Sequence, residues 1–222
     1  MRAVVIKSPT IAAECEILDE MFRLRKRVFL DRLHWNVSIS AGLERDEFDL
    51  LGPSYIVLLG DDARVVGTAR LMPADGPTML QNVFPFLLTH GRLEAHARMV
   101  ESSRFCVDTQ MPGASRGLLH EATLCLFAAI IEWSICHGYD EIVTATDLRF
   151  ERLLRHAGWP MRRLGVPHMI DQVESIAGTL PADRESFERV RPSGYASLAS
   201  FNSSMVHRLE KSAGTIQGIR SA

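Results

Sequence analysis

The segment SYIVLLGDDARVVGTARLM at residues 54–72 holds two apolar runs, rich in β-branched and aliphatic residues, on either side of the polar turn DDA. Two such runs joined by a short turn are typical of a β-hairpin. We therefore expect strands at 54–60 and 64–72, followed by a loop where PADGP occupies 73–77. This hairpin is the start of a sheet to which the other predicted elements can be added.

Strands and helices alternate in the second half of the chain, after an early helix and the hairpin. This order implies a mixed sheet with helices on both faces. We expect an α/β fold, a three-layer α/β/α sandwich with a mixed central sheet. Periodicity and turn residues predict strands at 2–6, 97–107 and 141–146, helices at 11–33 and 116–137, a helix after the N-cap residue Asp147, and two short strands between 161 and 180.

The length of 222 residues fits one domain. A chain of this size can bury roughly 70% of its unfolded surface around a single core. We assign residues 1–191 to that domain. From 192 the composition shifts to Ser and small residues without an apolar period, which predicts a mobile C-terminal arm at 192–222.

Charge and composition exclude several classes of protein. With 25 basic and 27 acidic residues the net charge is −2, so no positive field would concentrate nucleic acid or an anionic membrane. No apolar stretch approaches about 20 residues, the length of a membrane-spanning helix, and the apolar run at the start is too short for a secretory signal. We expect a cytoplasmic protein with neither nucleic acid nor membrane as a partner.

The cysteines and histidines give no metal-binding or disulfide pattern. The four cysteines contain no CxxC pair and the eight histidines no HExxH motif, so we expect no metal and no disulfide. Cys106, inside RFCVD, lacks the neighbours of an activated thiolate. We interpret it as a small core residue rather than a nucleophile.

One arginine of the first helix lies on its apolar stripe. At 100° per residue, Leu18, Phe22, Arg25 and Phe29 fall within about 40° of one another. Arg25 is therefore predicted to point inward with the phenylalanines. A buried arginine needs an anionic partner.

The segment ERDEFD at 44–49 places four acids within six residues. An isolated acidic cluster is usually a solvated turn. Here the aromatic residues Phe29 and Trp35 lie upstream, and aromatic faces with carboxylates are a common way to hold a sulfonium or ammonium ion. Both interpretations stay open from these residues alone.

The segment ESSRF at 101–105 carries the most specific structural prediction. In a regular strand Glu101 and Ser103 share one face, while Arg104 lies on the other. All three can face one cleft only across a β-bulge, and bulges are common beside active sites. We therefore predict a bulge between 101 and 104. The alternative for Glu101 is a salt-bridged strand residue.

The segment QMPGASRG at 110–117 ends a strand and opens the long helix. Backbone N–H groups and the helix dipole at such a position can bind an anion. The outline matches a QxxGxS phosphate loop, and Arg116 adds a positive charge. Glycine-rich turns are common, so this segment alone is weak evidence for a pantetheine or pyrophosphate ligand.

Six strings occur in order between about residue 20 and residue 165. They are MFRLRKRVFLDRLHW at 21–35, ERDEFD at 44–49, VVGTARLMP at 65–73, MLQNVFPFLL at 79–88, ESSRFCVD at 101–108 and GWP at 158–160. Considered together, they resemble the acyl-homoserine-lactone synthases of bacterial quorum sensing. Ala74 stands where that family usually has Thr.

The resemblance implies a fold similar to the GNAT N-acyltransferases and a two-step reaction without a cofactor. S-adenosylmethionine and an acyl thioester are then the substrates. The α-amine attacks the thioester, and the carboxylate next displaces methylthioadenosine to close the lactone. The family pattern carries over to Arg25, Phe29, Trp35, Asp46, Asp49, Arg70, Phe84, Glu101, Ser103 and Arg104.

Roles follow from the needs of that reaction. Glu101 is our candidate for the base that takes the proton of the amine, with Asp46 as second choice. Arg70 would order the cleft. Substrate recognition would use Arg25 or Arg104 for the carboxylate, Asp46 and Asp49 for the positive groups, Ser103 beside them, and Phe29 and Trp35 for the sulfonium and adenine.

The acyl chain is expected between the sheet and the long helix. Backbone N–H groups near Phe105 would bind the thioester oxyanion. A Thr near Thr144 often accompanies 3-oxo donors in the family, although Thr146 competes for that position. The predicted acyl and thioester residues are Phe84, Met99, Phe105, Leu118, Ala122, Leu126 and Thr144.

Acyl carrier protein and acyl-CoA both remain open as the donor. An acidic carrier protein could dock on a group of five arginines, and an ordinary solvated face would explain the same residues equally well. They are Arg149, Arg152, Arg155, Arg162 and Arg163.

Two other functions compete with lactone synthesis. One is a GNAT-type, acyl-CoA-dependent N-acyltransferase acting on another amine, which would release no methylthioadenosine. The other is a non-catalytic sensor that binds S-adenosylmethionine or acyl carrier protein.

Overall fold

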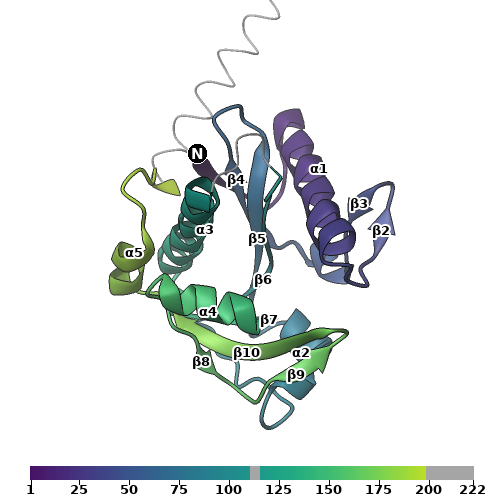
Figure 1. Ribbon diagram of the computed structural model, residues 1–222, viewed down its shortest axis with the longest axis vertical. Coiled ribbons are helices and arrows are strands. Elements are labelled where there is room, and N and C mark those ends of the chain that lie inside the picture. The colour runs from purple at the N-terminus through teal and green to yellow at the C-terminus, as the bar shows by residue number, and fades with distance from the viewer. Residues whose placement is uncertain (111–115, 199–222) are drawn as a thin grey trace, which may run out of the picture.

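The centre of the molecule is an eight-stranded mixed sheet (Figure 1). The computed structural model describes residues 1–110 and 116–198, apart from the side chains of 116–119. The strand order is β1-β4-β5-β6-β7-β10-β8, and β9 pairs with β10. The strands are β1 (Arg2–Ile6), β4 (Ser54–Leu59), β5 (Val65–Pro73), β6 (Met99–Val107), β7 (Glu141–Asp147), β8 (Arg162–Arg163), β9 (His168–Ile170) and β10 (Val173–Pro181).

The predicted hairpin is confirmed and lies within this sheet. β4 and β5 are antiparallel, with Ser54 opposite Leu71 and Tyr55 opposite Arg70. β6 and β7 pair in parallel, whereas the other neighbouring strands of the sheet are antiparallel. The parallel pair is short and ends where Glu101 lies opposite Val143. Beyond that point the two strands follow separate courses.

Helices cover both faces, as the three-layer prediction requires. α1 (Ala12–Lys26) lies on one face, and α3 (Arg116–Cys136), α4 (Leu148–His156) and α5 (Arg184–Val190) lie on the other (Figure 1). Alternate residues of β4 explain the layering. Ile56 packs in the core of the α3 side, and Val57 packs in the core of the α1 side.

Shorter elements extend the layer that contains α1. They are a two-stranded ribbon of β2 (Ile39–Ser40) and β3 (Leu43–Glu44), the 3₁₀-helices η2 (Glu47–Leu51) and η3 (Pro85–Leu87), and α2 (Met79–Asn82). These elements are too short to show a hydrophobic period, so the sequence did not predict them. They nevertheless carry several of the candidate site residues.

Two of the predicted element boundaries were wrong. The helix expected at 11–33 is α-helical only to Lys26, and Arg27–Arg32 form a π-helix, η1. The two short strands expected at 161–180 are three, and β10 alone has nine residues. Its central residues from Ser175 to Leu180 are all buried. A strand that is buried on both faces does not alternate apolar and polar residues, so its length could not be predicted from that pattern.

Part of the segment assigned to the C-terminal arm packs against α3. The carboxylate of Glu132 accepts hydrogen bonds from Tyr195 Oη at 2.7 Å, from Leu198 N at 3.0 Å and from the Ser197 hydroxyl. Leu198 is buried in the core of that layer. Residues 199–222, the remainder of that arm, lie outside the described part of the chain.

Within the described part of the chain, none of the helices has the length and apolar character needed to cross a lipid bilayer.

Candidate functional site

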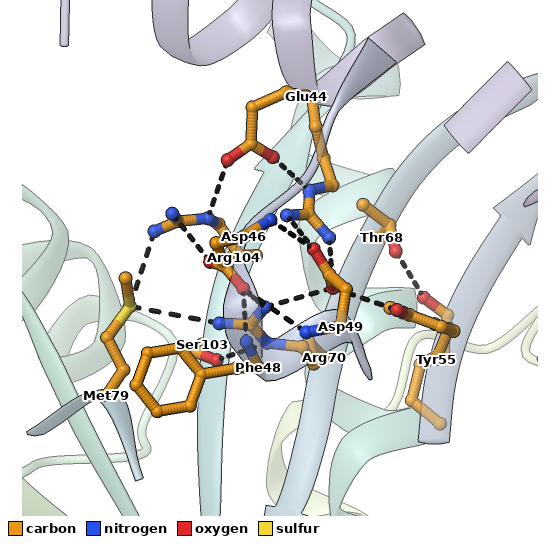
Figure 2. A network of polar contacts seen from close by, with 12 residues as sticks. Glu44, Asp46, Phe48, Asp49, Tyr55, Thr68, Arg70, Met79, Ser103 and Arg104 are labelled. Carbon is orange, nitrogen blue, oxygen red and sulfur yellow. Dashed lines mark hydrogen bonds and ion pairs between the residues drawn. The ribbon is translucent and has the colours of Figure 1, made fainter. Parts of the chain in front are cut away.

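Six charged side chains form a closed ring on the α1 face of the sheet (Figure 2). Arginines and carboxylates alternate around it, so that each arginine bridges two acids and each acid bridges two arginines. Their exposure is at most 9% of each side chain. Around the ring the order is Glu44, Arg25, Asp49, Arg70, Asp46, Arg104 and back to Glu44.

The first helix contributes Arg25, which is fully buried as its position on the apolar stripe predicted. Its two terminal nitrogens donate to Asp49 Oδ1 and Oδ2, each at 2.9 Å, and its Nε donates to Glu44. Both anionic partners come from segments that follow the helix. Removing one partner of such a buried ion pair typically costs about 3–5 kcal/mol, so this arginine fixes the acidic segment against α1.

The acidic segment folds inward because it caps its own helix. Asp46 is the N-cap of η2, where it accepts from the backbone N–H groups of Phe48 and Asp49, and Asp49 accepts in return from Asp46 N at 2.9 Å. This capping box turns both carboxylates toward the arginines. Arg45 and Glu47, on either side of Asp46, stay exposed. A solvated acidic turn is thus wrong for three of the four acids of this segment.

The predicted bulge in β6 is present and begins at Arg104. Arg70 lies opposite Ser103 and Thr68 opposite Cys106, so that Arg104 and Phe105 together face one residue of β5. Arg104 has a φ of 54°, a left-handed conformation that a non-glycine residue adopts at some cost. The bulge lies at the end of the interval expected for it.

The bulge brings Arg104 to the same face as Ser103. Its Nε donates to Glu44 Oε1 at 3.1 Å, and its Nη2 lies 2.8 Å from Asp46 Oδ2. Arg70 Nε donates to Ser103 Oγ at 3.1 Å. The regular ladder that would have separated these side chains is therefore excluded.

Glu101 lies beside the ring and is 2% exposed. Its carboxylate accepts from Leu80 N at 2.7 Å and from Met79 N at 3.0 Å, at the start of α2. Burial raises the pKa of Glu101, and the two backbone hydrogen bonds and the charge of Arg70 offset only part of that shift. A carboxylate with a raised pKa is a stronger base than a solvated one.

The two aromatic residues predicted to bind ligand are stacked on each other. The Phe29 and Trp35 rings are 5.1 Å apart and nearly parallel, at 7°. Phe29 is only 1% exposed and lies 5.6 Å from the guanidinium of Arg104, whereas Trp35 is partly exposed. Of the two, Trp35 has surface to offer to a ligand, and Phe29 supports it from behind.

The opposite face of β6 borders an apolar cavity of about 20 Å³. That volume holds roughly one water molecule. Thr144 Oγ1 donates to Ser102 O at 2.8 Å there, next to the point where β6 and β7 stop pairing. The lining residues are Ser102, Phe105, Phe127, Ile130, Ile142, Thr144, Phe150, Leu154, Trp159 and Leu180.

The predicted acyl residues fall into four groups, of which three belong to the α3 side or to residues near it. Phe105 and Thr144 line the cavity. Ala122 and Leu126 are buried in the same core without lining it. The side chain of Leu118 lies outside the described residues, as does most of QMPGASRG with its Arg116.

Met99 was expected to line a pocket beside the long helix, but it lies on the other face of the sheet, together with Phe84. Both pack with Leu80 and Leu87 on the face that carries Glu101. Met99 is two residues from Glu101 in a regular part of β6, and alternation puts both on one face. Neither residue contacts the cavity that faces α3.

Several residues of the site were missed at the sequence level. Glu44 was noted only as one acid among four, and its inward position depends on the short β2–β3 ribbon. Met79 has no signal in the sequence beyond its position in a quoted string. Phe150 and Leu154 could have been found, because they are four residues apart on α4 and so share one helical face.

The one cysteine near the proposed site, Cys106, is buried in the core of the α1 side. Burial raises the pKa of Cys106 to about 12, which disfavours the thiolate and agrees with a core residue. All four cysteines belong to the described part of the chain and are free. Among the described residues, no group of three or more His, Cys, Asp or Glu side chains is arranged to hold a metal ion.

Comparison with known proteins identifies the family. The autoinducer synthase family model matches residues 10–190. This chain belongs to the autoinducer synthase family. The match confirms the resemblance inferred from the six strings, and it covers the ring, Glu101 and the cavity.

Relatives and solved structures agree with this family. An acyl-homoserine-lactone synthase of Agrobacterium fabrum is 55% identical over 199 residues, which is 89% of this chain and 94% of that protein. One of Rhizobium radiobacter is 58% identical over 182 residues, 82% of this chain and 86% of that protein. The crystal structure of TofI in a ternary complex with an inhibitor and MTA has a TM-score of 0.73 at 27% identity, covering 86% of this chain and 96% of TofI.

Proposed function

We propose that this chain makes an N-acyl-homoserine lactone from S-adenosylmethionine and an acyl thioester and releases methylthioadenosine. One observation carries the proposal: the charged ring with Glu101 and the apolar cavity lie on opposite faces of β6, next to the point where its pairing with β7 ends. A charged amino acid and an acyl chain can therefore approach one reaction point from two sides. The relatives named above support this reaction.

Arg104 is the proposed partner of the substrate carboxylate. It is the most exposed arginine of the ring, at 9% of its side chain, whereas Arg25 is fully enclosed and bonded to Asp49 and Glu44. We therefore assign Arg25 and Asp49 to positioning. Arg70 links Asp49 to Ser103 and so orders the floor of the site.

Asp46 and Trp35 are proposed to hold the positive groups of the substrate. Asp46 Oδ2 is buried and accepts no hydrogen bond, although Arg104 Nη2 is 2.8 Å away. A buried acceptor without an aligned donor can accept an N–H of the substrate amine. Trp35 offers a partly exposed aromatic face to the sulfonium and adenine.

Glu101 is the proposed base, directly or through water. The amine, with an unperturbed pKa of about 8, loses its proton to Glu101 as its nitrogen forms a bond to the thioester carbon. The tetrahedral intermediate then breaks its C–S bond and expels the thiolate, which takes that proton from Glu101 and leaves as the thiol. In the second step a carboxylate oxygen bonds to the γ-carbon while the C–S bond breaks, and proximity favours this ring closure.

The bulge of β6 is the proposed oxyanion site. Arg104 and Phe105 fall outside the regular register with β5, and bulges commonly redirect backbone groups beside active sites. N–H groups near Phe105 would there donate to the oxygen of the tetrahedral intermediate.

An acyl carrier protein is the donor that the surface favours. α4 turns Phe150 and Leu154 toward the cavity and exposes Arg149, Arg152 and Arg155. An acidic carrier bound on that face would hold its thioester near the cavity. Arg162 and Arg163 are already paired with Glu141 and Glu151 and would contribute less. The proposed compartment is the cytoplasm, where both substrates occur.

Product analysis tests this function. Purified protein is incubated with S-adenosylmethionine and a panel of acyl carrier protein and acyl-CoA thioesters, and lactones and methylthioadenosine are measured by mass spectrometry. We expect equal amounts of both products. An acylated amine without methylthioadenosine would support the rival N-acyltransferase, and binding without turnover would support the sensor.

A further inference from the structure

Met79 connects the two parts of the site that the proposed reaction must coordinate. Its sulfur lies 3.3 Å from Arg104 Nη1 and 3.9 Å from Arg70 Nη2, while its backbone N–H donates to Glu101 at 3.0 Å (Figure 2). The residue is partly exposed at the start of α2. This residue thus contacts both the charged ring and the proposed base, Glu101.

The sulfur is the weakest acceptor that the ring arginines have. A thioether accepts hydrogen bonds poorly, whereas the ion-pair partners of Arg70 and Arg104 are carboxylates. The N–H groups that face Met79 are therefore the least satisfied donors of a nearly closed network. A carboxylate that reached them would form a much stronger, charge-assisted bond.

A second incomplete contact lies next to the first. Asp46 Oδ2 is buried and accepts no hydrogen bond. It lies 2.8 Å from Nη2 of the same Arg104 side chain. The Arg104 guanidinium therefore has one nitrogen, Nη1, that donates to a weak acceptor, and a second, Nη2, beside a carboxylate oxygen that accepts no hydrogen bond. The α-carboxylate and α-amine of an amino acid match this donor and this acceptor in charge.

We propose that the Met79 side chain is a placeholder that the carboxylate of S-adenosylmethionine displaces from Arg104. The methionine side chain is unbranched and has three rotatable bonds, so it can leave at small cost. Its backbone N–H stays on Glu101 during this exchange. This inference rests on S-adenosylmethionine being the substrate.

Two variants of Met79 separate displacement from simple packing. Met79→Gln has a similar length but offers an amide oxygen, a stronger acceptor that would hold the arginines. Met79→Leu keeps an apolar side chain without any acceptor. Val83→Gln, at an exposed position just after α2, is the matched control for adding an amide to this segment.

Calorimetric binding of two ligands provides the test. S-adenosylmethionine carries the carboxylate, and methylthioadenosine lacks it. We expect Met79→Gln to weaken S-adenosylmethionine binding roughly tenfold, the worth of one charge-assisted hydrogen bond, with methylthioadenosine binding unchanged. Met79→Leu should bind S-adenosylmethionine as tightly as the unaltered chain or more tightly, and Val83→Gln should change neither ligand.

Equal weakening of both ligands in Met79→Gln would overturn the inference, because packing alone would then explain it. So would unchanged S-adenosylmethionine binding in that variant. If the unaltered chain bound no S-adenosylmethionine, the proposed function itself would fail, which is a different result from either of these.

Discussion

The two faces of β6 differ in nearly every physical property. On the α1 face six charges compensate one another in a buried ring, and each is held by at least two partners. On the α3 face aromatic rings surround about 20 Å³ of space, enough for roughly one water. The charged side is organised before any ligand arrives, whereas the apolar side would have to open to hold the acyl chain that we propose for it.

This difference separates two kinds of recognition. A preorganised ring fixes the position of small charges accurately, because moving any member would leave another buried charge without a partner. An aromatic cluster is held by contacts that are individually weak and can be rearranged. We therefore expect the amino-acid substrate to be fixed by the ring and the acyl chain to depend on the residues around the cavity.

Removing Arg25 should have the largest effect on the charged side. Arg25→Ala leaves Glu44 and Asp49 buried without this partner, and we expect a loss of about 3–5 kcal/mol in the free energy of unfolding, measured with urea at neutral pH. Lys26→Ala is the control, because the next residue of the helix forms only a surface pair with Asp31. A loss no larger than that of the control would contradict a structural role for the ring.

The stability lost in Arg25→Ala should depend on pH. Burial alone would raise the pKa of Asp49, but the hydrogen bonds and charge of Arg25, with the charge of Arg70, hold it well below its ordinary value of 3.8. A depressed folded-state pKa stabilises the fold above that ordinary value, and this stabilisation is lost as the pH falls. Urea unfolding at several pH values should therefore show that the difference in free energy of unfolding between Arg25→Ala and the unaltered chain becomes smaller below about pH 4.

Glu101→Gln should abolish the proposed base and leave the ring intact. We expect turnover to fall about 100-fold or more, with S-adenosylmethionine still bound in calorimetry. Because burial raises the pKa of Glu101, kcat/KM should fall with decreasing pH from above the usual carboxyl range, and the variant should lack this acidic limb. Near-normal acylation in the variant would assign the base to another group, with Asp46 next in line.

Enlarging the cavity should change the donor preference without changing the charged side. Phe150 packs against Phe105 at 4.8 Å between ring centres and lines the cavity. Phe150→Leu should raise the kcat/KM of a longer acyl donor relative to a shorter one by about tenfold. Affinity for S-adenosylmethionine should stay unchanged. An equal change for all donors would show that the cavity does not hold the chain.

The smallest effect is expected at Trp35, the partly exposed aromatic residue on the face of the sheet that carries the charged ring. Trp35→Ala should weaken S-adenosylmethionine binding by about fivefold to tenfold through lost contact with the sulfonium and adenine. Trp35→Phe retains an aromatic face and should recover part of the affinity. Calorimetry that gave the same affinity for Trp35→Ala and the unaltered chain would exclude the aromatic contact.

Much of the site could be predicted because its local patterns are strong. The stripe that turned Arg25 inward depends only on helical geometry, and the bulge near Arg104 followed from the alternation of β6. The same alternation, applied two residues earlier, would have placed Met99 with Glu101 rather than on the acyl side. That error came from not extending a rule that the sequence already supported.

The amino-acid sequence by itself determined the hairpin, the order of strands and helices, the inward arginine and the family. Tertiary structure alone decided that Glu44, Asp46 and Asp49 close a ring with three arginines, that Met79 contacts both the ring and Glu101, and that an apolar cavity lies where the pairing of β6 and β7 ends. The physical reason is distance along the chain. Periodicity tells which face of its own element a residue occupies, whereas the partner on that face comes from segments 19 to 60 residues away, whose approach only the packed fold defines.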